Sequence, residues 1–273
     1  MKKKLNLIII IILISIVSIS CKKGDNKGEI KLEEKEKAPK SLVSIAEEID
    51  EILTSTSEIE KIIELTPLEF ETLEVKEKDK KSEDENKDEK DKIAEENLNL
   101  KDEELLKKWN DIDKKIDKTH KDWNDYEIDA MRKAINPEKT NEFKKNLNLC
   151  TKAVEDRNTK DILDTGSKAI LSLASFFELY KDEIKGDLSR IKYAAYQAYL
   201  VSETDIENAQ KLLDSTGESI TRLRQKLDKE KTKTLDKLAI AIEDMKKSLG
   251  EDNKKLLEIK RDIILDNIKL LEM

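Results

Sequence analysis

Apolar residues recur every three or four positions over most of this chain, the spacing that places them on one face of a helix. The pattern begins at Ser41 and continues to Leu65, and the opposite face of this stretch is acidic. Its apolar stripe comprises Leu42, Ile45, Ile49, Ile52, Leu53, Ile59, Ile62 and Ile63. Thr66-Pro67 should end the helix, because a residue before proline disfavours helical backbone angles. Leu68-Glu69-Phe70-Glu71 then alternates, which favours a short extended segment.

From about Leu98 to the carboxyl terminus, helical stripes follow one another without the alternation of a strand. Asn136-Pro137 and Asn158-Thr159 have the sequence of helix starts, and Gly186 indicates a break or kink. The stripe from Ile162 to Tyr180 is the most apolar, so this helix should lie centrally. The sequence therefore predicts an all-α fold, a helical bundle of about five to seven helices.

Two segments lack the apolar residues that a core requires. Residues 21–40 are highly charged and contain two glycines and a proline, which predicts a flexible, disordered tether. Residues 76–97 begin with a run of Lys, Glu and Asp, which favours a disordered linker over an exposed helix with charges paired four apart. We expect an export signal at 1–20, a tether at 21–40, an amphipathic helix with a short extended segment at 41–75, a charged linker at 76–97 and the bundle domain at 98–273.

The first residues have the pattern of an export signal. Lys2, Lys3 and Lys4 precede an uncharged apolar run, and small residues stand before Cys21. A basic start, a short apolar middle and small residues at the cleavage site are typical of a secretory signal peptide. Cleavage between Ser20 and Cys21 would leave a cysteine that can carry lipid, and two or three acyl chains anchor a protein stably. The alternative is an uncleaved anchor helix, but the run is short for a bilayer span.

The composition of the chain limits the classes of partner that it is expected to bind. The formal net charge is -8, and removal of the signal deletes three lysines and no acid. An acidic chain repels phosphate backbones, so we expect no nucleic acid partner. Charged residues make up 42% of the chain, with only 6 Gly and 3 Pro, which favours helices. Of the two cysteines, lipid on Cys21 would leave Cys150 alone, and its helical spacing with Phe143, Leu147 and Val154 predicts burial.

Catalytic and metal-binding patterns are scarce in this sequence. His120 is the only histidine, and it lies near the polar boundary of the stripe between Trp109 and Trp123. A single histidine is a poor basis for a metal site, although it can change charge with pH. The sequence has no glycine-rich phosphate loop, nucleophile elbow or EF-hand loop. We expect no catalytic residues, no metal, no cofactor and no enzyme activity.

Three tyrosines form the most distinctive aromatic feature. Tyr193, Tyr196 and Tyr199 are three residues apart, so on a helix their rings form a slanted row. Tyrosine is enriched in binding hot spots, which makes the row a candidate binding surface. The alternative is that the rings pack in or beside the core around a close helix contact made by the intervening alanines. The acidic face of the 41–65 helix, which could dock reversibly on the bundle, is a second candidate.

The amino-terminal pattern resembles the plasmid-encoded outer-surface lipoproteins of Borrelia. The features that carry the resemblance are the start MKKKLNLIIIIILISIVSISC, the site Ser18-Ile19-Ser20-Cys21 with serine where leucine is usual, and the charged tether. The all-helical remainder, which lacks disulfides, is similar in style but matches no single family by motif. The resemblance implies a lipid-anchored, immunogenic protein of the outer membrane, at the cell surface, which binds a host serum or extracellular-matrix protein. No binding residue carries over from it.

Two hypotheses remain for the function. The first is a surface lipoprotein that interacts with the host as an adhesin or in immune or complement evasion. The second is a structural or envelope-assembly lipoprotein that faces the periplasm, since the sequence does not decide between the two sides of the outer membrane. Neither the ligand nor the oligomeric state can be predicted from these residues.

Overall fold

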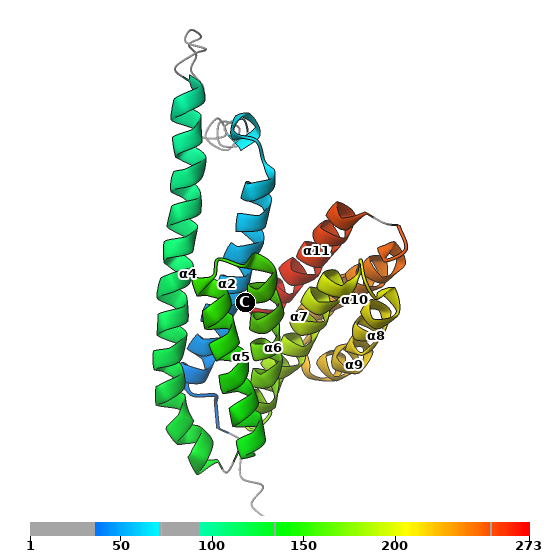
Figure 1. Cartoon of the computed structure of the whole chain (residues 1–273). Helices are drawn as coiled ribbons and strands as arrows, with labels where there is room; N and C mark the ends of the chain where they lie inside the picture. The colour runs from blue at the N-terminus through cyan, green and yellow to red at the C-terminus, as the bar shows by residue number, and fades with distance from the viewer. Residues whose placement is uncertain (1–35, 71, 73–92, 134, 252) are drawn as a thin grey trace, which may run out of the picture. The chain divides into compact units, whose positions relative to one another are not determined.

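The computed structural model describes residues 36–70, 72, 93–133, 135–251 and 253–273, which are all helical or in short connections (Figure 1). The described part contains nine helices of nine residues or more and no strand. They are α2 (Lys40–Glu64), α4 (Ile93–Arg132), α5 (Pro137–Glu155), α6 (Thr159–Phe177), α7 (Glu183–Val201), α8 (Ile206–Asp214), α9 (Thr216–Lys226), α10 (Lys229–Ser248) and α11 (Lys254–Glu272). The predicted all-α class is confirmed, but five to seven helices was too few.

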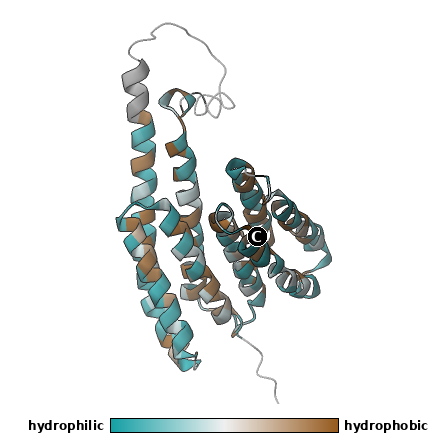
Figure 2. Ribbon diagram, turned by 45° about the vertical axis from the view of Figure 1, so that its right-hand side comes forward, coloured by the Kyte–Doolittle hydropathy of each residue, from teal (hydrophilic) through white to brown (hydrophobic). Residues whose placement is uncertain are grey.

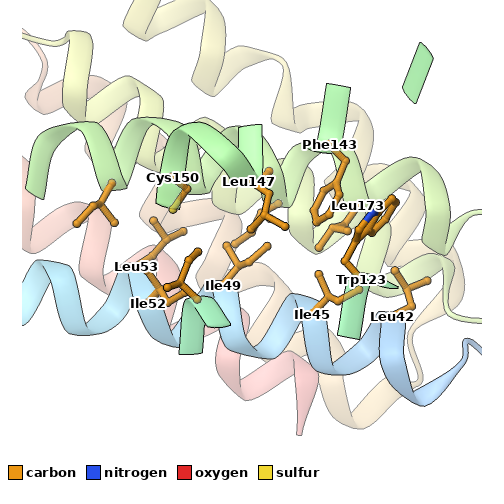
Figure 3. Packing of buried hydrophobic residues seen from close by; sticks show 14 of the residues in the cluster. Leu42, Ile45, Ile49, Ile52, Leu53, Trp123, Phe143, Leu147, Cys150 and Leu173 are labelled. Atoms are coloured by element: carbon orange, nitrogen blue, oxygen red, sulfur yellow. The ribbon is translucent and has the colours of Figure 1, made fainter. Parts of the chain in front are cut away.

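The first core cluster lies among α2, α4, α5 and α6. Trp123 of α4 packs against Phe143 of α5 and Phe176 of α6, with ring centroids 4.4 Å and 5.9 Å away. From α2 the cluster takes Leu42, Ile45, Ile49, Ile52, Leu53 and Ile59. Figure 3 shows Leu42, Ile45, Ile49, Ile52 and Leu53 of α2 on the side that faces Leu147, Cys150 and Leu173. Helix α2, which the sequence analysis placed in a separate segment before the bundle domain, therefore contributes to the core of the bundle.

The second core cluster lies among α7, α8, α9, α10 and α11. Its members include Leu188, Ile191, Leu213, Leu223, Leu235, Leu238, Met245, Leu257, Ile264 and Ile268. Helix α7 belongs to both clusters, because Tyr196 packs in the first while Ala195 and Ala198 pack in the second. Figure 2 shows the corresponding mixture of hydrophobic and hydrophilic positions along each helix. Helix α7 thus has two apolar faces and packs one of them in each core.

Polar side chains set the helix boundaries. Asn136 and Asn158 accept hydrogen bonds from the first-turn amides of α5 and α6, as predicted, and Asp205 and Asn253 do the same for α8 and α11. Residues 67–70 are helical, which corrects the predicted extended segment. Thr66 and Glu69 form a capping box there: the Thr66 amide donates to Glu69 (2.8 Å) and the Glu69 amide to Thr66 Oγ1 (3.3 Å).

Gly186 does not break the chain, contrary to prediction, because it lies in the first turn of α7. A Cβ atom there would lie 2.9 Å from the carbonyl oxygen of Ala174 on α6. The break falls earlier, in the turn at 178–182 between the two helices. Glycine at this position therefore allows the backbones of α6 and α7 to approach closely.

Candidate functional site

The predicted lipidation site, Cys21 with cleavage after Ser20, lies outside the described residues, as do the rest of the signal and most of the tether and charged linker. The described chain begins at Glu36, whose carbonyl accepts a hydrogen bond from the Lys181 amide at 2.8 Å. The Ala38 amide donates to Asp182 at 2.7 Å, and Lys133 pairs with Glu36 at 3.0 Å. These contacts correct the predicted tether at its carboxyl end, because residues 36–39 are held against the α6–α7 turn and the end of α4.

The predicted tyrosine surface is not a surface in the structure. Tyr196 and Tyr199 are buried, with 1% and 8% of their area exposed, and only Tyr193 is half-buried. The guanidinium of Arg261 on α11 lies 4.4 Å from the ring centroid of Tyr199 and 5.6 Å from that of Tyr196. Burial raises the pKa of Tyr199 to about 12. The row therefore packs inside the fold, the alternative that the sequence left open.

Beside this row, a cleft of about 250 Å³ lies over α7 between α2 and α11. Its lining residues are Asp50, Thr54, Ser57, Glu58, Lys61, Lys192, Tyr196, Asp262, Leu265, Asp266 and Lys269. We call this the α2–α11 cleft. Charged and small polar groups dominate the lining, and the apolar contribution comes from Tyr196 and Leu265. It is therefore a polar junction between helices rather than an apolar ligand pocket.

Lys192 is the central charge of the α2–α11 cleft. Its side chain is 8% exposed, and Nζ lies 2.8 Å from Asp50 on α2 and 2.9 Å from Glu272 on α11. Burial disfavours the charged ammonium, but the two carboxylates together outweigh burial and raise the pKa of Lys192. The Lys192 ammonium on α7 thus pairs with carboxylates of both α2 and α11 and links the three helices.

A second group of charges lies at the other end of the cleft. Lys61 of α2 lies 2.6 Å from Asp262 and 3.7 Å from Glu258, both on α11. Arg261 is fully buried, and its Nη1, like Oε1 of Glu258, has no hydrogen-bond partner among the described residues. Burial also raises the pKa of Glu60, against the opposing effects of Thr159 and Arg261. Ion pairs thus link α2 and α11, and Leu265 of α11 also packs against the first core, whereas α11 meets α10 and α7 through the second core.

The acidic face of α2, the second predicted surface, is largely occupied by α4. Lys108 pairs with Glu58 at 2.7 Å, Lys115 with Glu51, and Lys118 with Glu48 at 3.0 Å. Figure 1 shows α2 and α4 side by side along this row. Helix α2 also buries its apolar stripe in the first core, so it is docked on the bundle in this structure, and the reversibility of that docking stays a prediction.

Cys150 lies in the first core, and His120 is half-buried on α4. Cys150 is 1% exposed, and burial raises the pKa of its thiol to about 12, so the predicted burial is confirmed. Nε2 of His120 lies 2.8 Å from the hydroxyl of Thr151, and burial lowers the pKa of His120 despite the nearby Asp117. A thiolate nucleophile is therefore disfavoured at this position.

Sequence reasoning missed one feature, the end of the α2–α4 pair that lies farthest from Glu36. Ile63, Leu68 and Leu100 are 54%, 69% and 41% exposed there, and Leu106, six residues farther along α4, is 61% exposed. Lys101 ties the two helices together by donating to the carbonyl oxygens of Ile63 and Leu65, at 3.2 Å and 2.5 Å. We call these four apolar residues the distal end. Ile63 continues the core stripe of α2, so its exposure could not be read from periodicity.

Within the part of the chain that the structure describes, there is no cluster of three or more histidine, cysteine or acidic side chains arranged to hold a metal ion. Among the same residues, no helix is long and apolar enough to cross a bilayer. Comparison of the chain with protein-family models, curated proteins and solved structures gave no match.

Proposed function

We propose that this chain is a lipid-anchored protein of the bacterial outer membrane that presents a helical bundle at the cell surface and binds a host protein there without catalysis. The observation that carries the proposal is the sequence before Cys21, a basic and apolar leader with small residues at the cleavage site. A lipid on Cys21 would hold a bundle that begins only fifteen residues later, at Glu36.

The distal end is the surface that we assign to the host protein. Helix α2 has 25 residues, or roughly 37 Å, and Ile63 is its second-last residue, at the end away from Glu36. Exposed large apolar side chains that gather at one end are typical of protein-binding surfaces. This surface replaces the tyrosine row as the binding candidate.

Protease treatment of intact cells tests the location. We expect the protein to be degraded while a periplasmic marker survives, and we expect Cys21→Ala to abolish labelling by a fatty acid. If the protein survives in intact cells and is lost only after rupture of the outer membrane, the bundle faces the periplasm. That outcome would refute the host-binding function and favour the envelope-assembly alternative.

Binding is tested with purified serum and extracellular-matrix proteins on a sensor surface. We expect saturable binding of at least one of them, and a loss of about tenfold or more in affinity for a Leu68→Asp/Leu106→Asp variant, since apolar anchors dominate interface energies. Ile240→Asp is the matched control, because Ile240 is 62% exposed on α10, outside the distal end. An equal loss in both variants would exclude the distal end as the binding surface.

A further inference from the structure

The start of the described chain marks one end of the bundle. Glu36 accepts from the Lys181 amide and pairs with Lys133, which is the residue after the last of α4. The Ala38 amide donates to Asp182 in the turn before α7. The chain thus enters the bundle beside the carboxyl end of α4.

Two exposed apolar side chains lie in the last turns of α4, next to this entry point. Met131 is 70% exposed and Ile128 is 51% exposed. They are three residues apart, so they share one side of the helix. Arg132 follows directly, with 76% of its side chain exposed, and its ion pair with Asp129 is long, at 3.5 Å. Apolar side chains beside an exposed cation are the combination found where proteins meet a lipid surface.

The length of chain before Glu36 limits what this end can approach. Fourteen residues separate Cys21 from Glu36. Even a fully extended chain of this length reaches only about 50 Å. Helix α4 has 40 residues, which corresponds to roughly 60 Å. An anchor at Cys21 would therefore keep the Glu36 end nearest the membrane.

We propose that the carboxyl end of α4 is a membrane-contact site, at which Met131 and Ile128 enter the lipid headgroup layer and Arg132 pairs with headgroup phosphates. This inference rests on the proposed lipid at Cys21. The contact at the end of α4 is a second, weak attachment to the membrane, in addition to the acyl chains on Cys21. This second attachment orients the bundle with its distal end away from the lipid. A second contact of this kind needs little affinity of its own, because the anchor raises its effective concentration.

A lipid surface fits this site better than a protein does. Two apolar side chains and one guanidinium fall far short of the roughly 800 Å² that each partner buries in a stable protein interface. The same groups are sufficient for a surface contact that an anchor already holds in place.

The test measures how deeply α4 residues lie on vesicles. Residues 1–21 are replaced by a hexahistidine segment, and the protein is attached to vesicles of phosphatidylcholine and phosphatidylglycerol that contain a nickel-chelating lipid. Both core clusters lie downstream of Glu36, so this change removes no described packing. A fluorophore is placed by Met131→Cys, or by Leu106→Cys as the matched control on the same helix. Cys150 is buried with a raised thiol pKa, so the label goes to the introduced cysteine.

We expect attachment to vesicles to reduce quenching of the residue 131 label by aqueous iodide about threefold or more, and to leave the residue 106 label unchanged, since interfacial side chains are shielded from water. Adding Ile128→Asp and Arg132→Glu should restore quenching at residue 131. Equal quenching at residue 131 on vesicles and in solution would overturn the proposal, and so would equal shielding at both positions. Because the histidine segment replaces acylation, this experiment does not depend on lipidation at Cys21. A result that overturns the membrane contact is therefore distinct from one that overturns the lipid anchor.

Discussion

At the residue scale, Lys192 shows how a buried charge on α7 links α2 and α11. Its side chain is 8% exposed, and its ammonium is shared by two carboxylates from different helices. No sequence pattern indicates this role, because a lysine between Ile191 and Tyr193 is expected to face solvent. Only the tertiary arrangement, with Glu272 at the end of the chain brought beside Asp50, makes the buried cation possible.

We expect Lys192→Met to destabilise the fold by roughly 2–4 kcal/mol, because it leaves two partly buried carboxylates facing each other without a cation. Urea denaturation followed by circular dichroism measures the change. Adding Asp50→Asn to Lys192→Met should recover part of the loss. If Lys192→Met is as stable as the parent protein, the triad does not hold the three helices together.

His120 provides a prediction on pH. Burial lowers its pKa in the folded state below the ordinary value of 6.5, so the folded protein binds this proton less readily than the unfolded chain does. Stability should therefore fall as pH drops below about 6.5, and the loss should level off once pH is below the folded pKa. Denaturation of the parent and His120→Gln proteins at pH 7.5 and 5.5 isolates this contribution. An equal change in both would show that His120 contributes none of the pH dependence.

At the scale of elements, helix existence was predictable and helix partners were not. The stripe of α2 and the caps at Asn136 and Asn158 depend on neighbours within a few residues, so the sequence determines them locally. The sequence also predicted that Tyr193, Tyr196 and Tyr199 form a row, but not that Arg261, far along the chain, covers part of it. Gly186 was misread because a close helix approach and a helix break both favour glycine.

The place of α2 in the first core gives a prediction at this scale. Six of its Leu and Ile side chains are almost fully buried in that cluster, and each contributes about 1.5–3 kcal/mol. Their sum approaches or exceeds the 5–15 kcal/mol net stability of a typical domain. We expect a chain that starts at residue 66 to lose cooperative thermal unfolding and expose the first core, whereas a chain that starts at residue 36 keeps the full transition. Cooperative unfolding of both would support the boundary that we first drew at residue 98.

At the scale of the whole molecule, two core clusters raise the question of whether they unfold separately. Helix α2, the first described helix, contributes to the first cluster, and α11, the last helix, contributes to the second. Helix α7 contributes Tyr196 to one and Leu188 and Ile191 to the other, so neither cluster is complete without it. Lys192, on the same helix, binds α2 and α11 at once. These shared groups couple the two cores.

We therefore expect a single cooperative unit. Leu238→Ala in the second core should cost about 2–4 kcal/mol, as truncation of a fully buried leucine does. Under native conditions, hydrogen exchange should then speed up to the same degree in the slowest amides of α6 and of α10, because both would exchange through the same global opening. If only α8 to α11 lose protection while α6 keeps it, the cores open independently, and α7 joins them without coupling their stability.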